Sequence, residues 1–171
     1  ENKLPKVVIP VHFAGYPSDM EKIFNLSKKF KFKIIEDASH ALGSIYKKNK
    51  IGNCKFSEAT IFSFHPVKII TTGEGGAIMT NNKQLNLKLK SLRSHGIIKN
   101  YINKKKVIKN KPWIFFQKDL GLNYRLTDIQ ASLGTSQLKK LNRFTRNRND
   151  IAKIYNRELR ALPLKLPTLS W

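Results

Sequence analysis

The pattern of apolar and polar residues near the start of the chain predicts a strand followed by a helix. Val7–Val11 is a short β-branched run typical of a buried strand, and Pro10 should lie near its end because proline has no amide hydrogen to donate. Ser18 and Glu21 have the spacing of a capping box, so we expect a helix to begin at about Asp19. Apolar residues at helical spacing follow directly and support that helix.

A second strand is predicted at Lys33–Asp37, where an apolar pair is followed by two carboxylates. Strand, helix and strand within roughly 30 residues form a βαβ unit, whose two strands run parallel. Asp37 would then lie at the carboxyl end of a parallel strand. Because open α/β sheets bind their ligands beyond the carboxyl ends of the strands, Asp37 is a candidate binding residue.

The rest of the chain continues as strands and helices, with one irregular segment. We expect strands at Ala59–Phe64 and Gly76–Thr80, and helices at about Lys83–Ser94, Thr127–Leu141 and Arg143–Leu162. Ile98–Lys118 has no clean period and many lysines, so we expect a mobile surface loop there, with an aromatic anchor at 113–116. The predicted fold class is α/β, with a mainly parallel sheet flanked by helices.

The length and the ends of the chain suggest part of a larger protein. A chain of 171 residues corresponds to one domain or a piece of one. It opens without methionine just before a strand-like segment and stops soon after two prolines, so we expect an interior fragment, truncated at both ends. The sequence has no secretory signal and no apolar run of about 18 residues, and its one cysteine, Cys54, cannot form an internal disulfide. We therefore expect a cytoplasmic protein.

The chain is strongly basic, with 33 Lys and Arg against 11 Asp and Glu and a formal net charge of +22. Such a balance makes nucleic acid and anionic membrane surfaces the first partners to consider. The basic residues are mostly interspersed among Asn and Ile, which indicates a compositional bias more than a dedicated binding face. We expect no specific nucleic-acid partner and no membrane partner.

Lys68 and Asp37 together suggest one kind of chemistry, since Asp37 is predicted at the carboxyl end of one strand and Lys68 just past the end of another. An enzyme that uses pyridoxal phosphate needs a lysine amine to form a Schiff base and a carboxylate to keep the pyridine nitrogen protonated. Each residue also has a simpler interpretation, because an acid after a strand is commonly a helix cap or loop residue and most lysines are surface charge. The two residues alone leave both interpretations open.

Three motifs, in order, resemble one enzyme family. They are Glu36–Ser44 (EDASHALGS), Ser63–Lys68 (SFHPVK) with Gly73–Gly76 (GEGG), and Gly121–Gly134 (GLNYRLTDIQASLG). Together they resemble the DegT/DnrJ/EryC1 family of pyridoxal phosphate-dependent nucleotide-sugar aminotransferases, over nearly the whole chain. Pro10–Gly15 (PVHFAG) and the HPVK form that ends at Lys68 most resemble the members that serve pseudaminic acid biosynthesis.

The resemblance implies a fold and a reaction. Residues 1–142 would be part of the large domain of an aspartate aminotransferase-like enzyme of fold type I, and 143–171 a helix leading into a small domain. The reaction would be transfer of an amino group, with glutamate as the expected donor, to a 4-keto-6-deoxy nucleotide sugar such as a UDP-N-acetylhexosamine derivative. The nucleotide sugar and the amino-acid donor would be the small-molecule partners.

The resemblance also implies a role for each of five residues. Lys68 would form the Schiff base with pyridoxal phosphate and move the proton during the transfer. Asp37 would face the pyridine nitrogen, and His40 would lie near the 3-hydroxyl of the ring. Ser63 would donate to the cofactor phosphate. Asn123 would reach the phosphate of the cofactor in a neighbouring subunit, which implies a homodimer.

Two other functions fit parts of the pattern. A sugar dehydratase has the same fold, but such enzymes carry a histidine at the position of Lys68. A non-catalytic binding or regulatory protein on this scaffold would use the +22 charge to hold nucleic acid, but it would have no need of a lysine and a carboxylate at neighbouring strand ends. The aminotransferase is the favoured interpretation.

Overall fold

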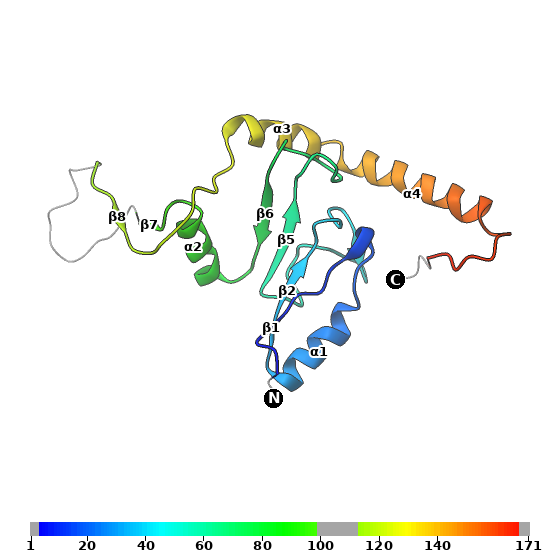
Figure 1. The fold of residues 1–171 in the computed structure, drawn as a ribbon, viewed down its shortest axis with the longest axis horizontal. Helices are drawn as coiled ribbons and strands as arrows, with labels where there is room; N and C mark the ends of the chain where they lie inside the picture. The colour runs from blue at the N-terminus through cyan, green and yellow to red at the C-terminus, as the bar shows by residue number, and fades with distance from the viewer. Residues whose placement is uncertain (1–3, 99–112, 168–171) are drawn as a thin grey trace. The chain divides into compact units, whose positions relative to one another are not determined.

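The computed structural model describes residues 4–98 and 113–167, and the chain divides into two compact units. Unit 1 combines Glu1–Thr80 with Asp128–Trp171, and unit 2 is Asn81–Thr127 (Figure 1). In chain order the elements are β1 (Val7–Val8), the short 3-10 helix η1 (Phe13–Gly15), α1 (Met20–Phe30), β2 (Lys33–Asp37), β3 (Ile45–Tyr46), β4 (Asn49–Lys50), β5 (Ala59–Ser63), β6 (Gly76–Met79), α2 (Lys83–Leu92), β7 (Ile97–Ile98), β8 (Phe116–Gln117), α3 (Asp128–Leu138) and α4 (Leu141–Glu158).

The main sheet lies in unit 1 and has the strand order β1-β2-β5-β6 (Figure 1). β1 and β5 both pair in parallel with β2, whereas β6 returns antiparallel to β5. The sheet is therefore mainly parallel, and the predicted α/β class is confirmed. The predicted βαβ unit is present as β1, α1 and β2, and β2 has the predicted bounds.

The first strand is shorter than predicted. The expected run Val7–Val11 forms a regular ladder only over β1, which ends at Val8. Pro10 interrupts the ladder because it has no amide hydrogen, although its carbonyl accepts the amide hydrogen of Asp37 at 3.0 Å. Val11 rejoins the sheet through a single parallel bridge to Asp37. The first segment thus reaches the carboxyl end of β2 in spite of the proline.

The predicted start of α1 is confirmed, but the capping box is wrong. Asp19 is the N-cap residue, and its side chain makes no capping hydrogen bond. The Ser18 hydroxyl donates to the carbonyl of Val11 at 3.0 Å, and the Glu21 carboxylate pairs with the Lys47 ammonium. Both side chains that the spacing assigned to the cap therefore bond to other segments of the chain.

The remaining elements lie at their predicted positions, but most end earlier than predicted and α4 also begins earlier, at Leu141 in place of Arg143. β5 and β6 each end one residue early, α2 ends at Leu92 and α3 at Leu138, and α4 runs from Leu141 to Glu158. Helix ends are the least certain part of any prediction from sequence because the last turn has unpaired carbonyl groups. The assignment of 1–142 and 143–171 to a large and a small domain stays a prediction.

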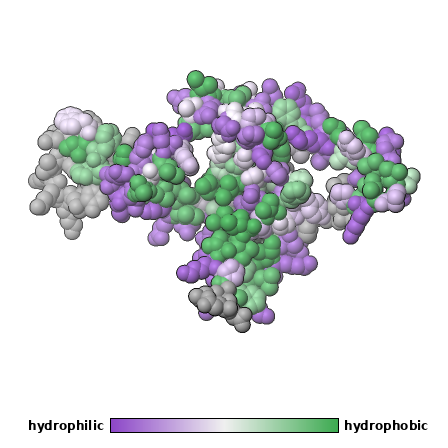
Figure 2. Space-filling view, viewed as in Figure 1, coloured by the Kyte–Doolittle hydropathy of each residue, from purple (hydrophilic) through white to green (hydrophobic). Residues whose placement is uncertain are grey.

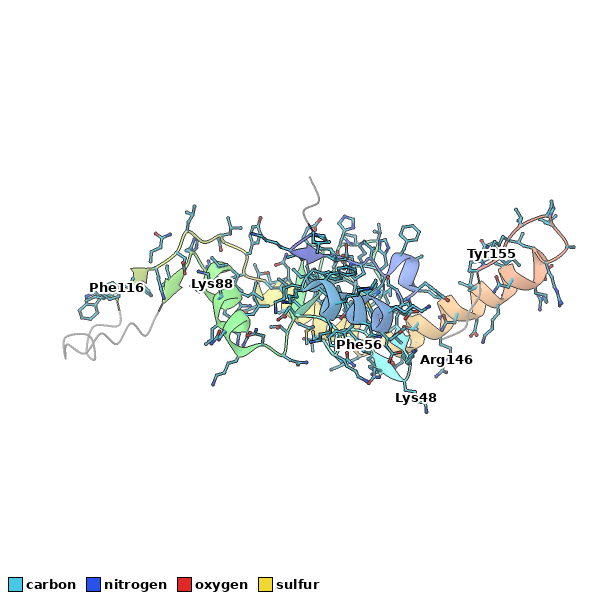
Figure 3. The ribbon with its side chains drawn as sticks, turned by 90° about the horizontal axis from the view of Figure 1, so that it is seen from below. Lys48, Phe56, Lys88, Phe116, Arg146 and Tyr155 are labelled. Carbon is cyan, nitrogen blue, oxygen red and sulfur yellow. The ribbon has the colours of Figure 1, made fainter. Side chains whose placement is uncertain are left out.

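The core of unit 1 lies between α1, the β3–β4 hairpin and one face of the sheet. Its buried residues are Met20, Ile34, Ala38, Ala41, Tyr46, Ile51 and Phe62. Phe56 lies beside α1 (Figure 3), and its ring stands edge-on to Phe24 and Tyr46, with centroids 5.7 and 6.0 Å away. The Tyr46 hydroxyl donates to the Asp19 carboxylate at 2.7 Å, which ties the hairpin to the start of α1.

The opposite face of the sheet exposes β-branched side chains. Val7, Ile9 and Val11 are 43%, 57% and 48% exposed, and Ile78 of β6 is 47% exposed. Figure 2 shows hydrophobic surface over the region where Figure 1 places β1 and β2. Val11 is the bridge partner of Asp37, so strand alternation puts Asp37 on this second face.

Unit 2 contains α2 and a short antiparallel ladder of β7 with β8. This ladder occupies the two ends of Ile98–Lys118, where a loop was predicted, and 99–112 lie outside the described residues. The predicted aromatic anchor is wrong, because Trp113 and Phe115 are 67% and 57% exposed and Phe116 is 41% exposed. These rings do not enter a core of the described chain.

Candidate active site

Asp37 lies at the carboxyl end of β2, as predicted, and its backbone is fixed on both sides. Its amide donates to Pro10, and its carbonyl accepts from His12 at 2.9 Å. The carboxylate Oδ1 accepts from the amide of Ser39 at 3.0 Å. Hydrogen bonding from Ser39 lowers the pKa of the Asp37 carboxyl, and the nearby Lys68 ammonium lowers it further. Asp37 is therefore ionised at neutral pH.

Lys68 lies in a turn between β5 and β6 that folds back onto the end of β5. The Phe64 amide donates to Gly75 at 2.8 Å, and the Phe64 carbonyl accepts from the Thr72 amide at 3.0 Å. The Thr71 hydroxyl donates to the same carbonyl at 3.1 Å. Ile70 is 1% exposed and anchors the turn, while Lys68 itself is half-buried. The lysine is thus carried by an ordered turn.

Helix α3 supports this turn from a distant part of the sequence. The Gln130 side chain donates to the carbonyl of Glu74 at 3.1 Å. Gly134 approaches the turn so closely that a Cβ atom there would lie 2.8 Å from Cγ2 of Thr72, which is 3% exposed. The absence of a side chain at Gly134 therefore allows α3 to pack against the turn that carries Lys68.

Three of the predicted site residues lie at the same edge of the sheet. Asp37 pairs in register with Ile61, and Ser63 lies two positions further along β5, so alternation puts Asp37 and Ser63 on the same face. The Ser63 hydroxyl accepts from the amide of His65 at 3.4 Å, at the start of the turn. Lys68 is near enough to lower the pKa of Asp37. A carboxylate, a hydroxyl and an amine thus gather at this edge.

His40 lies three residues beyond Asp37 and is exposed. Its Nδ1 accepts from the amide of Ala14 at 3.4 Å, and its ring stands edge-on to Phe13, with centroids 5.9 Å apart. Ala14 has a φ of 52°, which is uncommon for a residue other than glycine. The turn after β1 is therefore shaped around the His40 side chain.

Asn123 belongs to unit 2, where its backbone forms an isolated antiparallel bridge with Ser94. Its neighbours Leu122 and Tyr124 donate to the carbonyls of Leu92 and Arg93 at 2.7 and 2.8 Å. These bonds satisfy carbonyl groups at the end of α2. Asn123 is exposed and is placed by the end of that helix.

One buried polar pair beneath the site was not predicted from the sequence. Glu36 and His12 are 4% and 0% exposed, and Glu36 Oε2 lies 2.9 Å from His12 Nε2. Strand alternation could have indicated that Glu36 faces the core when Asp37 faces the other side. A buried carboxylate requires a partner, but nothing in the sequence identified His12 as that partner.

No group of three or more His, Cys, Asp or Glu residues that could hold a metal ion occurs among residues 4–98 and 113–167. Within the same ranges, every helix is too short or too polar to cross a membrane.

The chain is similar in sequence to curated nucleotide-sugar aminotransferases. It is 46% identical over 153 residues to the UDP-4-amino-4,6-dideoxy-N-acetyl-beta-L-altrosamine transaminase of Campylobacter jejuni, an alignment that covers 90% of this chain and 38% of that enzyme. The Helicobacter pylori transaminase of the same name is 39% identical over 166 residues, which cover 97% of this chain and 41% of that enzyme. The chain thus spans about two fifths of the length of these relatives.

Solved structures agree with this result. Helicobacter pylori PseC, an aminotransferase involved in the biosynthesis of pseudoaminic acid, matches with a TM-score of 0.80 and 39% identity over 91% of this chain and 38% of that one. The PLP form of a sugar aminotransferase from Streptococcus pneumoniae matches with a TM-score of 0.77 and 28% identity over 96% of this chain and 45% of that one. Residues 2–170 match the family model, and the chain belongs to the DegT/DnrJ/EryC1/StrS aminotransferase family.

Proposed function

We propose that the protein is a pyridoxal phosphate-dependent aminotransferase that transfers an amino group, with glutamate as donor, to a 4-keto-6-deoxy nucleotide sugar. The single observation that carries the proposal is that Asp37 and Lys68 lie at the ends of neighbouring strands, β2 and β5. An ionised carboxylate at the end of β2 lies within electrostatic reach of a half-buried lysine that follows β5. These two groups are the ones that this chemistry requires.

The residues at this edge of the sheet fit the cofactor. Ser39 is the hydrogen-bond donor to the Asp37 carboxylate among the described residues, and the carboxylate keeps further lone pairs that can accept a proton-bearing ring nitrogen. The lowered pKa of Asp37 keeps that carboxylate ionised. Ser63 adds a hydroxyl donor on the same face, suited to a phosphate oxygen. The donor set therefore matches a ring nitrogen, an aldehyde and a phosphate.

Each residue then has a separate task. When bound, pyridoxal phosphate supplies an aldehyde that condenses with amines and a ring that accepts electrons from the carbon being deprotonated. Lys68 would hold the cofactor through its amine and would take and return a proton at Nζ during the transfer. Asp37 would keep a proton on the ring nitrogen, His40 would orient the 3-hydroxyl, and Ser63 would bind the phosphate.

The substrate class rests on the relatives. The transaminases of Campylobacter jejuni and Helicobacter pylori are named for a UDP-linked 4-amino-4,6-dideoxy sugar, and PseC is named for pseudoaminic acid biosynthesis. A 4-keto-6-deoxy sugar nucleotide would yield such an amine. The substrate carries a diphosphate, so the net charge of +22 would favour its encounter with the protein. This account needs no nucleic-acid partner.

The proposal includes a homodimer in the cytoplasm. Asn123 is exposed at the end of α2, where its side-chain amide could donate to the cofactor phosphate of a second subunit. A two-fold axis would make this contribution reciprocal, so that each subunit completes the other's site. The same-fold dehydratase is disfavoured because Lys68 stands where such enzymes carry histidine.

The test is a chemical trap on the complete gene product. Borohydride treatment of the protein loaded with pyridoxal phosphate should remove the visible absorbance of the bound cofactor and leave a pyridoxyl group fixed to one lysine. Proteolysis and mass spectrometry should locate that group on Lys68. A pyridoxyl group on another lysine, or protein that takes up no cofactor, would contradict the proposal.

A further inference from the structure

Beneath Asp37, on the core face of β2, Glu36 is the centre of a buried polar network. Its carboxylate accepts hydrogen bonds from His12 Nε2 at 2.9 Å, from Thr60 Oγ1 at 3.1 Å and from the Ser57 hydroxyl. His12 and Thr60 are 0% exposed, and Glu36 is 4% exposed. Three donors from two separate segments, the turn after β1 and the stretch that enters β5, therefore converge on one buried carboxylate.

The direction of each hydrogen bond in this network is fixed. The amide of Ser18 donates to Nδ1 of His12 at 3.1 Å, so Nδ1 carries no proton and Nε2 carries the proton that it donates to Glu36. Burial raises the pKa of Glu36, but the hydrogen bonds from His12 and Ser57 outweigh it and leave the pKa below its usual value. The network thus consists of a carboxylate and neutral donors.

Backbone hydrogen bonds connect the network to the candidate site. The amide of His12 donates to the carbonyl of Asp37 at 2.9 Å, and the amide of Gly15 donates to the carbonyl of His12 at 3.2 Å. In the same turn, the Ala14 amide donates to Nδ1 of His40. A single imidazole, held from both nitrogens, therefore fixes a segment that touches both Asp37 and His40.

We infer that His12 and Glu36 are positioning residues, which hold Asp37 and His40 in the direction that the cofactor ring requires. This inference rests on the proposed function. Neither residue touches the cofactor; both act through the end of β2 and through the turn at 12–15. Burying a carboxylate is unfavourable unless hydrogen bonds offset its lost solvation, so the position of Glu36 makes the network depend on all of its donors.

Two substitutions of His12 separate its two hydrogen bonds. In His12→Gln the amide nitrogen can take the place of Nε2 and donate to Glu36, whereas the shorter side chain of His12→Asn can only accept from Ser18. Tyr46→Phe is the matched control. It removes a buried hydroxyl bond from the same core, to Asp19, outside the Glu36 network.

The measurement uses the complete gene product with pyridoxamine phosphate, which has no aldehyde and so cannot bond covalently to Lys68. Equilibrium dialysis gives its Kd, and the nitrogen-15 resonance of ring-labelled cofactor reports whether the ring nitrogen is protonated. We expect His12→Asn to raise the Kd about tenfold, equivalent to about 1.4 kcal/mol, and to lower the protonated fraction. His12→Gln and Tyr46→Phe should stay within about threefold of wild type.

Three outcomes are decisive. The inference is overturned if His12→Asn and Tyr46→Phe lower the melting temperature alike while both keep the wild-type Kd and resonance. If His12→Asn does not fold, the double variant Ser57→Ala with Thr60→Val removes two donors to Glu36, and an unchanged Kd there also overturns the inference. Wild-type protein that binds neither pyridoxal phosphate nor pyridoxamine phosphate would overturn the proposed function itself.

Discussion

The two strand ends that carry Asp37 and Lys68 are neighbours in the sheet but are held in different ways. The end of β2 is held from the core, because Glu36 precedes Asp37 and accepts hydrogen bonds from buried donors. The turn after β5 is held by its own residues and by a helix, through the Thr71 hydroxyl, backbone hydrogen bonds and the packing of α3 against Thr72.

Because of this difference, substitutions near Asp37 should affect both folding stability and activity, whereas substitutions of Lys68 should affect activity alone. A substitution under Asp37 changes the core and the site together, since the same strand serves both. A substitution of Lys68 changes the site alone, because the turn is anchored by Ile70 and Thr72, which are 1% and 3% exposed. Substitutions at the site and at the residues that support it should therefore differ in their effects on activity and stability.

The largest effect is expected for Lys68→Ala. No other amine is carried by the same turn, so turnover by the complete gene product should fall by at least about 10³-fold, about 4 kcal/mol in barrier. The melting temperature should change little, because Lys68 is only half-buried. Lys55→Ala, at an exposed lysine beside the Phe56 ring, is the control and should keep wild-type turnover. Normal turnover in Lys68→Ala would refute the assigned role.

Asp37→Asn should have the next largest effect. The amide oxygen can still accept from Ser39, so the fold should persist, but an amide cannot stabilise a protonated ring nitrogen. Most activity should be lost in a steady-state assay, and Asp19→Asn, which removes a carboxylate at the start of α1, should keep it. Activity within about threefold of wild type, about 0.65 kcal/mol in barrier, would mean that Asp37 has a structural role instead.

Gly134→Ala tests the support of the turn by α3. The new methyl group would lie 2.8 Å from Cγ2 of Thr72, and such overpacking costs about 1–3 kcal/mol, partly offset by about 1 kcal/mol of helix propensity. Chemical denaturation should show a net loss of stability. In a Thr72→Ser background, which lacks Cγ2, the same substitution should be neutral or stabilising. A loss of equal size in both backgrounds would show that the contact with Thr72 is not the cause.

The smallest effect is expected on the loss of folding stability at acid pH. The pKa of Glu36 is lower in the folded protein than its ordinary value of 4.5, so the unfolded chain binds the proton more readily. The stability that Glu36 contributes is therefore complete above about pH 4.5 and is lost as the pH falls through the folded pKa. Melting temperatures measured from neutral to acid pH should decline less steeply in Glu36→Gln than in wild type, and parallel curves would contradict this.

The sequence predicted the features that depend on local pattern. A short apolar run located β2 and β5, and the βαβ spacing put Asp37 at a carboxyl end, because these signals arise within one element or between consecutive ones. Tertiary contacts decided the rest. Ser18 and Glu21 bond to Val11 and Lys47 in place of the predicted cap, and no local rule gives those partners.

The residues that support the site also could not be predicted from the local sequence pattern. His12 meets Glu36 across 24 positions of sequence, and Gln130 meets Glu74 across 56. Such pairs become neighbours only when the sheet and α3 are assembled. The residues that are proposed to contact the cofactor could be named from the sequence, but the residues that hold them could not.

Because Glu36 and Asp37 are adjacent and face opposite sides of the sheet, the number of residues in β2 also matters. Side chains alternate between the two faces of a strand, so the deletion or insertion of one residue within Lys33–Asp37 would exchange the faces of Glu36 and Asp37. One acid would lose its buried donors, and the other would enter the core without partners. We therefore expect natural variation in this part of the family to occur by substitution, with changes in length confined to the connecting loops.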